Sequence, residues 1–248
     1  MWWSSRKQNT ATPPPGTRVY AIGDIHGCLS RLKALQQKIL NDRDKAPESR
    51  FVLVYVGDYV DRGPDSREVI DHLLNAPLPG LETVHLKGNH EDYMQRFFEG
   101  DLDIGAGWIA YGGGETLISY GIVVDTRLPE FSELKTLQAR FAEMAPAAHI
   151  AFLNSLAYHH VEGGYAFVHA GIAPGVAMAD QDAADLMWIR EPFLKSNDDH
   201  EYVIVHGHTP SRKVENKANR INIDTGAVYG GPLTAVVLAG AERMFLQA

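Results

Sequence analysis

Three short apolar segments, each ending in glycine and then an acidic or amide residue, constrain this chain more than any other feature. They predict buried β-strands over 18–23, 51–56 and 81–86. Amphipathic helices are expected over 29–43, from Asp65 onward and over 90–99. A strand–helix order repeated three times favours parallel strands joined by helical crossovers. Because ligands bind beyond the carboxyl ends of parallel strands, we expect the polar residues there to meet at one point.

The residues at those three strand ends have the composition of a metal site. They are Asp24, His26, Asp58, Asn89 and His90. Two later strand candidates, 165–168 and 202–205, lead to three more imidazoles, those of His169, His206 and His208. Carboxylate, imidazole and amide ligands without a thiolate suit Mn²⁺, Fe²⁺, Zn²⁺ or Ni²⁺. Because these are more ligands than one catalytic ion with an open position needs, two ions are predicted, with Asp58 central enough to bridge them.

The rest of the chain is less regular. Residues 101–120 are rich in glycine and are expected to form a long loop or short helices, and residues 131–157 are expected to be helical. A hairpin is predicted over 158–161 and 165–168, followed by strands over 202–205, 221–223, 235–238 and 243–246. Residues 224–227 and Tyr229 fit either a pocket wall or a simple turn at a strand end.

Composition limits the organisation and the partners of the chain. Its 248 residues fit one folded domain over 18–248, and residues 1–17, with three consecutive prolines, are expected to form a disordered tail. The single cysteine, Cys28, excludes an intrachain disulfide and favours a reducing, cytoplasmic setting. A net charge of −8 and the lack of a long apolar run argue against nucleic acid and membranes as partners. The oligomeric state stays open and is compatible with a monomer.

Five short motifs together resemble those of a known family. They are GDIHG at 23–27, GDYVDRG at 57–63, GNHE at 88–91, HAG at 169–171 and HGHT at 206–209. They resemble the phosphoprotein phosphatase branch of the calcineurin-like metallophosphoesterases, of the bacterial serine/threonine phosphatase type, over about 18–240. This resemblance implies an α/β fold in which a β-sandwich of two mixed sheets is flanked by α-helices. The active site would lie at the carboxyl ends of the strands.

The resemblance implies a set of metal ligands. They are Asp24, His26, Asp58, Asn89, His169 and His208. Asp24 and His26 would hold the first ion, Asp58 would bridge, and the other three would complete the second, with Mn²⁺ the expected metal. Strand alternation up to His206 and the position of His208 after Gly207 also favour His208 as the ligand. His206 would then be a neighbour, and a hydrogen-bond partner of a ligand at most.

The remaining site residues implied by the resemblance act on the substrate. His90 would be the general acid for the leaving group, oriented by Asp61. Arg62, Arg190 and Asn89 would bind phosphate oxygens, with Arg190 placed by the short match WIRE at 188–191. Two divalent ions and two arginines would make the pocket positive in a chain that is acidic overall, as a phosphate dianion requires.

These residues predict a phosphoester hydrolase. A hydroxide bridging the two metal ions would attack phosphorus directly and in line. The favoured substrate is phosphoserine or phosphothreonine in a protein, or a small phosphoester. The alternative is a symmetrical dinucleoside polyphosphate, such as diadenosine tetraphosphate, with the discrimination expected in 101–157. A non-catalytic metal-binding scaffold is disfavoured because neither a ligand nor the acid histidine is lost.

Overall fold

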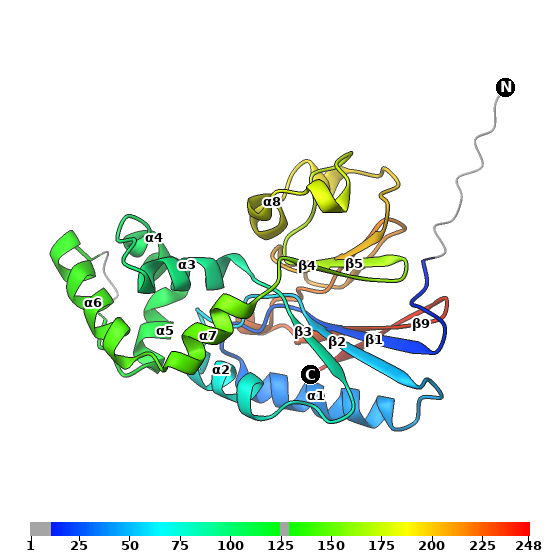
Figure 1. Ribbon diagram of the computed structural model, residues 1–248, viewed down its shortest axis with the longest axis horizontal. Helices are drawn as coiled ribbons and strands as arrows, with labels where there is room; N and C mark the ends of the chain where they lie inside the picture. Colours follow the sequence, from blue (N-terminus) through cyan, green and yellow to red (C-terminus); the bar gives the residue numbers. More distant parts are fainter. Residues whose placement is uncertain (1–10, 125–128) are drawn as a thin grey trace.

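The protein is a sandwich of two five-stranded sheets with helices on both outer faces (Figure 1). The structure is a computed structural model that describes residues 11–124 and 129–248. Both sheets contain parallel and antiparallel neighbours. The predicted α/β sandwich of two mixed sheets flanked by helices is therefore confirmed. No helix within the described ranges is long and apolar enough to cross a membrane.

The first sheet contains the three strands that carry the early motifs. Its members are β1 (Thr17–Ile22), β2 (Arg50–Tyr55), β3 (Glu82–His85), β9 (Thr234–Ala239) and β10 (Glu242–Gln247). Their order is β10-β9-β1-β2-β3. β1, β2 and β3 are parallel, as predicted, whereas β9 and β10 are antiparallel additions next to β1. The carboxyl ends of β1, β2 and β3 therefore open on the same edge of the sheet.

The second sheet delivers the two late histidine motifs to the same region. It contains β4 (His159–Glu162), β5 (Tyr165–Val168), β6 (Val203–His206), β7 (Glu215–Asn216) and β8 (Arg220–Asn222). Their order is β4-β5-β6-β8-β7, and β5, β6 and β8 are parallel. Strands β4 and β5 form the predicted hairpin. The two-residue strand β7 has too little periodicity to be detected in the sequence.

Helices cover the outer faces and extend the fold at one end (Figure 1). They are α1 (Leu29–Arg43), α2 (Ser66–Asn75), α3 (Asn89–Phe98), α4 (Gly105–Trp108), α5 (Gly114–Ser119), α6 (Phe131–Met144), α7 (Ala147–Ser155) and α8 (Ala183–Trp188). Short 3₁₀ turns occupy Met178–Asp180, Phe193–Lys195 and Ala227–Tyr229, and a π-helical turn, Ile109–Gly113, joins α4 to α5. The glycine-rich segment 101–120 thus contains short helices, one of the two outcomes predicted.

Successive side chains of β1 point to opposite faces of the first sheet, and both sets are buried. Val19 and Ala21 pack between the sheets with Phe167 of the second sheet. Tyr20 and Ile22 pack on the opposite side, in the core that includes the buried faces of α1 and α2. From Val19 to Ile22 the strand has no charged side chain, because both of its faces are covered there.

Two predicted boundaries need correction. The helical region 131–157 is two helices, because Pro146 lacks an N–H group and keeps Ala145 extended, with ψ 124°. The expected tail does not reach residue 17. The hydroxyl of Tyr165 donates to the carbonyl of Ala11 at 3.0 Å, the amide of Gly164 donates to that of Thr12 at 2.9 Å, and β1 begins at Thr17. Only residues 1–10 of that prediction remain, and they lie outside the described residues.

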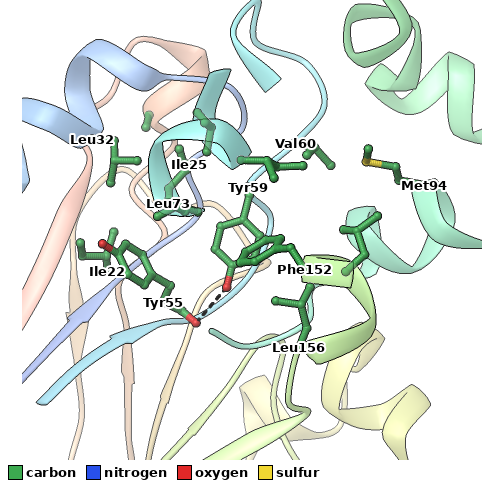
Figure 2. Close-up of a cluster of buried hydrophobic side chains, with 14 of the residues drawn as sticks. Ile22, Ile25, Leu32, Tyr55, Tyr59, Val60, Leu73, Met94, Phe152 and Leu156 are labelled. Carbon is green, nitrogen blue, oxygen red and sulfur yellow. Dashed lines mark hydrogen bonds between the residues drawn. The ribbon is translucent and has the colours of Figure 1, made fainter. Parts of the chain in front are cut away.

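Apolar residues inside the second motif anchor the loop after β2 in the core. The Tyr59 ring is fully buried, and its hydroxyl donates to the carbonyl of Leu86 at 2.7 Å and lies 3.4 Å from that of Tyr55 (Figure 2). Val60 packs in the same cluster, near Met94 of α3. The polar residues of this motif are therefore presented on a rigid support.

Candidate active site

The five motif-bearing loops meet at the carboxyl ends of β1, β2, β3, β5 and β6. Asp58, which follows β2, lies at the centre. Its Oδ2 is 3.4 Å from Nε2 of His26 and 4.0 Å from Nε2 of His90, and its Oδ1 is 3.4 Å from Nε2 of His169. All four side chains are buried. Strand-end position in the sequence thus predicted a real spatial cluster.

Two compact groups of potential metal ligands share Asp58. One contains His26, Asp58 and His90, and the other contains Asp58, His169 and His208. A carboxylate common to both groups is what a bridging ligand requires. The first group contains His90 where the resemblance implied Asp24. The carboxylate of Asp24 instead accepts the backbone N–H of His208, with N···Oδ2 3.0 Å.

Backbone carbonyls hold two of the imidazole rings with Nε2 directed at Asp58. Nδ1 of His26 lies 2.7 Å from the carbonyl oxygen of Val60, and Nδ1 of His169 lies 2.9 Å from that of Val56. An Nδ1–H that donates to a carbonyl leaves Nε2 as the ligand atom, which is the common arrangement at metal sites. Both rings are therefore preorganised for coordination.

The side chain of Asn89 connects the two late histidines. Its Oδ1 lies 3.0 Å from Nε2 of His169 and 2.9 Å from Nδ1 of His208. Close backbone approach brings His208 there, because a Cβ at Gly207 would lie 1.9 Å from Oδ1 of Asp24. The glycine between the two histidines of the HGHT motif is therefore required by packing against Asp24.

The charge around Asp58 favours a cation. Burial lowers the pKa of His169, but the carboxylates nearby, Asp58 foremost, outweigh burial and raise it to about 9. Burial likewise raises the pKa of the Asp58 carboxyl, yet the surrounding histidine rings, that of His169 first, hold it well below its usual value. The field that retains a proton on His169 would also attract a divalent ion in its place.

Two other imidazoles are already in the form that binds metal. Burial lowers the pKa of His26 to about 3, with the nearby side chains of His90 and Arg62 adding to the effect. Burial, reinforced by His169, lowers the pKa of His208 to about 3. Both rings are therefore neutral near pH 7, and each keeps one unprotonated nitrogen that can bind a metal ion.

A buried pair of His90 and Asp61 adjoins this cluster. Nδ1 of His90 lies 2.6 Å from Oδ2 of Asp61. Oδ2 of Asp61 also accepts the indole N–H of Trp108 at 2.9 Å, and Oδ1 accepts the hydroxyl of Thr116 at 2.5 Å. Burial lowers the pKa of His90, but Asp58 and Asp61 outweigh it and raise the value above normal. His90 is thus fixed in orientation by its contact with Asp61.

Glu91, whose role the sequence analysis missed, organises the loop after β2. Its carboxylate accepts the backbone N–H groups of Asp58 at 2.8 Å, Tyr59 at 2.7 Å and Gly88 at 3.0 Å. Burial, with Asp58 adding repulsion, raises the pKa of Glu91 to about 7. Its place as the last letter of the GNHE motif was the available signal. Trp108 and Thr116 had none, because their partner Asp61 is 47 and 55 residues away in the chain.

The backbone of these loops is unusual. Five non-glycine residues of the described chain have positive φ, between 45° and 73°, and all five belong to the candidate site: His26, Asp58, Asp61, Arg62 and His208. Left-handed conformations of such residues carry a free-energy cost and cluster at functional sites. Burial and hydrogen bonding of the loops hold these conformations in place.

A cavity of about 330 Å³ opens next to the cluster. Its walls include both predicted arginines, Arg62 and Arg190, together with His90, His208 and Asn89. Nη2 of Arg62 lies 2.8 Å from Nε2 of His90. The structure thus brings together the predicted ligands, the predicted acid and both predicted arginines. Tyr93, Tyr111 and Trp188 complete the wall, and the rings of Tyr93 and Trp188 lie 4.9 Å apart between their centroids.

His206, the other histidine of the HGHT motif, has different surroundings. It is fully buried, with Nε2 3.2 Å from Nη1 of Arg220 and Nδ1 3.1 Å from the carbonyl oxygen of Gly207. The Phe193 ring packs against it at 5.1 Å between centroids. These contacts suit a structural histidine.

Two arginines and a histidine held by an aspartate line a cavity beside a carboxylate that is surrounded by imidazoles. That arrangement suits the binding and hydrolysis of a phosphoester with the help of bound metal. Fold and site together define the class of metal-dependent phosphoesterases. The chain belongs to the calcineurin-like phosphoesterase family, which it matches over residues 17–232. The family uses a pair of divalent metal ions, and the donor set described above fits such a pair.

Related proteins are named for nucleotide and phosphoprotein substrates. The chain is 31% identical over 230 residues to a protein of Anoxybacillus flavithermus named bis(5′-nucleosyl)-tetraphosphatase PrpE (asymmetrical), covering 87% of this chain and 88% of that protein. The fold is similar to that of a putative diadenosine tetraphosphatase, with TM-score 0.62, 20% identity and coverage of 95% and 96%. It is also similar to a cold-active protein tyrosine phosphatase, with TM-score 0.56, 19% identity and coverage of 97% and 83%.

Proposed function

We propose that this protein hydrolyses dinucleoside tetraphosphates asymmetrically, using two bound divalent metal ions. Water would add across one phosphoanhydride bond and give a nucleoside triphosphate and a nucleoside monophosphate. The observation that carries the chemistry is the cavity that unites Arg62, Arg190 and the His90–Asp61 pair beside the Asp58 cluster. The name of the Anoxybacillus flavithermus relative supports the substrate class. From the sequence alone, a phosphoprotein is the favoured substrate, and symmetrical cleavage of a dinucleoside polyphosphate is the alternative.

The residues around Asp58 would hold the metal ions. Asp58 would be shared by both ions, His26 and Asp24 would bind one, and Asn89, His169 and His208 would bind the other. When bound, such ions polarise phosphoryl oxygens and lower the pKa of water. Mn²⁺ is the expected activator, because the ligand set has no thiolate.

The other side chains would bind and protonate the substrate. Arg62 and Arg190 present guanidinium groups that can bind phosphate oxygens in a bidentate fashion. His90, held through Nδ1 by Asp61, would donate its Nε2 proton to the leaving oxygen. The indole of Trp108 and the hydroxyl of Thr116 keep the Asp61 carboxylate in place for this task.

Phosphoserine or phosphothreonine in a protein is the second candidate substrate. The observation in its favour is the His90–Asp61 pair itself, with its 2.6 Å contact. An alkoxide leaving group needs a proton far more than a phosphate leaving group does, so a well-held acid matters most for alkyl phosphoesters.

A panel assay of the purified protein with Mn²⁺ tests the proposal. Diadenosine tetraphosphate, a phosphoserine peptide and para-nitrophenyl phosphate are compared by kcat/KM, and nucleotide products are separated by chromatography. We expect the dinucleotide to be preferred, with ATP and AMP as products. Two ADP molecules would mean symmetrical cleavage, and a preference for the peptide would transfer the proposal to the second candidate.

Substitution of either arginine is expected to reduce turnover without releasing metal. Arg62→Ala and Arg190→Ala should each lower kcat/KM about 10–100-fold, the scale of a lost charged hydrogen bond to phosphate. Arg96→Ala is the matched control, because Arg96 is exposed and pairs with Asp101. Steady-state kinetics and metal content check the prediction. If Arg190→Ala is kinetically silent, the role of the WIRE segment is wrong.

The two histidines of the HGHT motif should differ in metal content. His208→Ala is expected to lose about one metal equivalent and most of its activity, because His208 belongs to the second ligand group. His206→Ala should keep both metals and lose at most about 10–100-fold, since its contacts are to Arg220 and Phe193. Elemental analysis of the two variants decides between them. The reverse pattern would make His206 the ligand.

A further inference from the structure

A second cavity, of about 440 Å³, lies beside the one that holds the arginines. It shares Arg62 and Tyr111 with that cavity, so the two are neighbours across these side chains. Its other walls include Ile109, Ile118 and Tyr229. The mechanism above makes no use of it.

The wall of this cavity has the chemistry of a site for a flat aromatic ring. Tyr111 and Tyr229 are 66% and 65% exposed, and Ile118 is 52% exposed, which is unusual for large apolar side chains gathered at one place. The carboxylate of Glu115 lines the same cavity and can accept an N–H group. Aromatic faces bind nucleobases by stacking, and an acceptor recognises an exocyclic amino group.

We infer that this second cavity binds the base of the nucleoside whose phosphate occupies the arginine cavity. The inference rests on the proposed function and names a purine base with an amino group, such as adenine, as the occupant. Tyr111 lines both cavities, so its ring can contact a base in the second cavity while the attached phosphate occupies the first.

The backbone fixes this cavity relative to the phosphate-binding loop. Residues of the π-helical turn Ile109–Gly113 line it, and the carbonyl of Gly112 accepts the backbone N–H of Arg62 at 3.1 Å. Gly112 has φ 118°, and a Cβ there would lie 2.7 Å from the backbone nitrogen of Arg62. The base wall and the phosphate-binding arginine are thus parts of one hydrogen-bonded unit, as recognition of base and phosphate at a set separation requires.

Competition between two phosphate monoesters tests the inference. AMP and ribose 5-phosphate carry the same phosphate on the same sugar, and only AMP carries a base. Both compounds are tested as inhibitors of para-nitrophenyl phosphate hydrolysis by the Mn²⁺-loaded protein. We expect AMP to bind at least about 10-fold more tightly than ribose 5-phosphate, the scale of one stacked base. Tyr111→Ala and the cavity-filling Ile118→Trp should bring the two inhibition constants to within about 3-fold of each other, whereas Tyr111→Phe should keep the preference.

Phe131→Ala is the matched control, because Phe131 is 64% exposed on α6 and outside both cavities. It should leave the preference for AMP unchanged. Equal inhibition by AMP and ribose 5-phosphate in the unaltered protein would overturn the inference, as would a preference that survives both Tyr111→Ala and Ile118→Trp. A preference for AMP that these variants abolish, in a protein that does not hydrolyse diadenosine tetraphosphate, would support the base site and refute the proposed substrate. The proposed base site and the proposed substrate can therefore be refuted independently of each other.

Discussion

Removal of divalent metal is expected to lower the hydrolysis of every phosphoester at least about 10³-fold, the consequence of losing several kcal/mol of transition-state stabilisation. The carboxylate of Asp58 would then face the neutral ring of His26 and the protonated ring of His169, with no metal ion between them. Because metal binds the folded chain in preference to the unfolded one, the melting temperature should fall as well. Chelation followed by dialysis, with metal content, activity and thermal unfolding measured on one sample, checks both effects.

Adding metal back to the chelated protein distinguishes loss of metal from irreversible damage to the protein. Mn²⁺ should restore turnover and thermal stability together, and Fe²⁺, Zn²⁺ and Ni²⁺ should restore them to different extents. A Ca²⁺ addition is the control, since hard oxygen-preferring Ca²⁺ is poorly matched to imidazole ligands. Full activity in a sample verified to be free of metal would exclude the proposed centre.

Replacement of His90 is the second change with a large expected effect. His90→Asn should lower kcat on a phosphoserine peptide about 10²–10⁴-fold, the range for a general acid. The loss on para-nitrophenyl phosphate should be much smaller, because phenolate leaves without full protonation. Steady-state kinetics on both substrates, with metal content measured in parallel, provides the test.

Metal content makes this result interpretable, because His90 lies in the ligand group with His26 and Asp58. The variant should keep its metal if His90 serves as the acid. His72→Asn, on α2 and away from the cluster, is the matched control and should match the unaltered protein. Equal losses on both substrates would refute the acid role, and loss of one metal equivalent would make His90 a ligand.

The sequence predicts this fold well where local rules apply. The strands 18–23 and 51–56 are predicted within one residue because they are buried on both faces and end at glycine. The cluster around Asp58 was predictable because residues that follow parallel strands lie together at the carboxyl edge of the sheet. Helix breaking at Pro146 was equally local, but it was hidden within a long run of helix-forming residues.

What the sequence did not reveal depends on distant partners. Trp108 and Thr116 fix Asp61 across about fifty residues, and no period or motif connects them. The carboxylate of Asp24 binds the backbone of His208, a contact that exists only after both sheets have packed. Substrate discrimination was expected in 101–157, where Tyr111 lies, but its π-helical turn has no signature in composition, so the second cavity itself had to come from the structure.

The five site residues with positive φ create a conflict between activity and thermal stability. Glycine could adopt the φ values of His26, Asp58, Asp61, Arg62 and His208 without the penalty, about 1–2 kcal/mol each, that a side chain incurs. Selection for heat resistance alone would therefore favour glycine wherever the hydrogen bonds lost with the side chain cost less than this penalty, and the chemistry would be lost with the side chain. Thermostable versions of this enzyme are better sought in the helical layers, away from the loops that follow β1, β2 and β6.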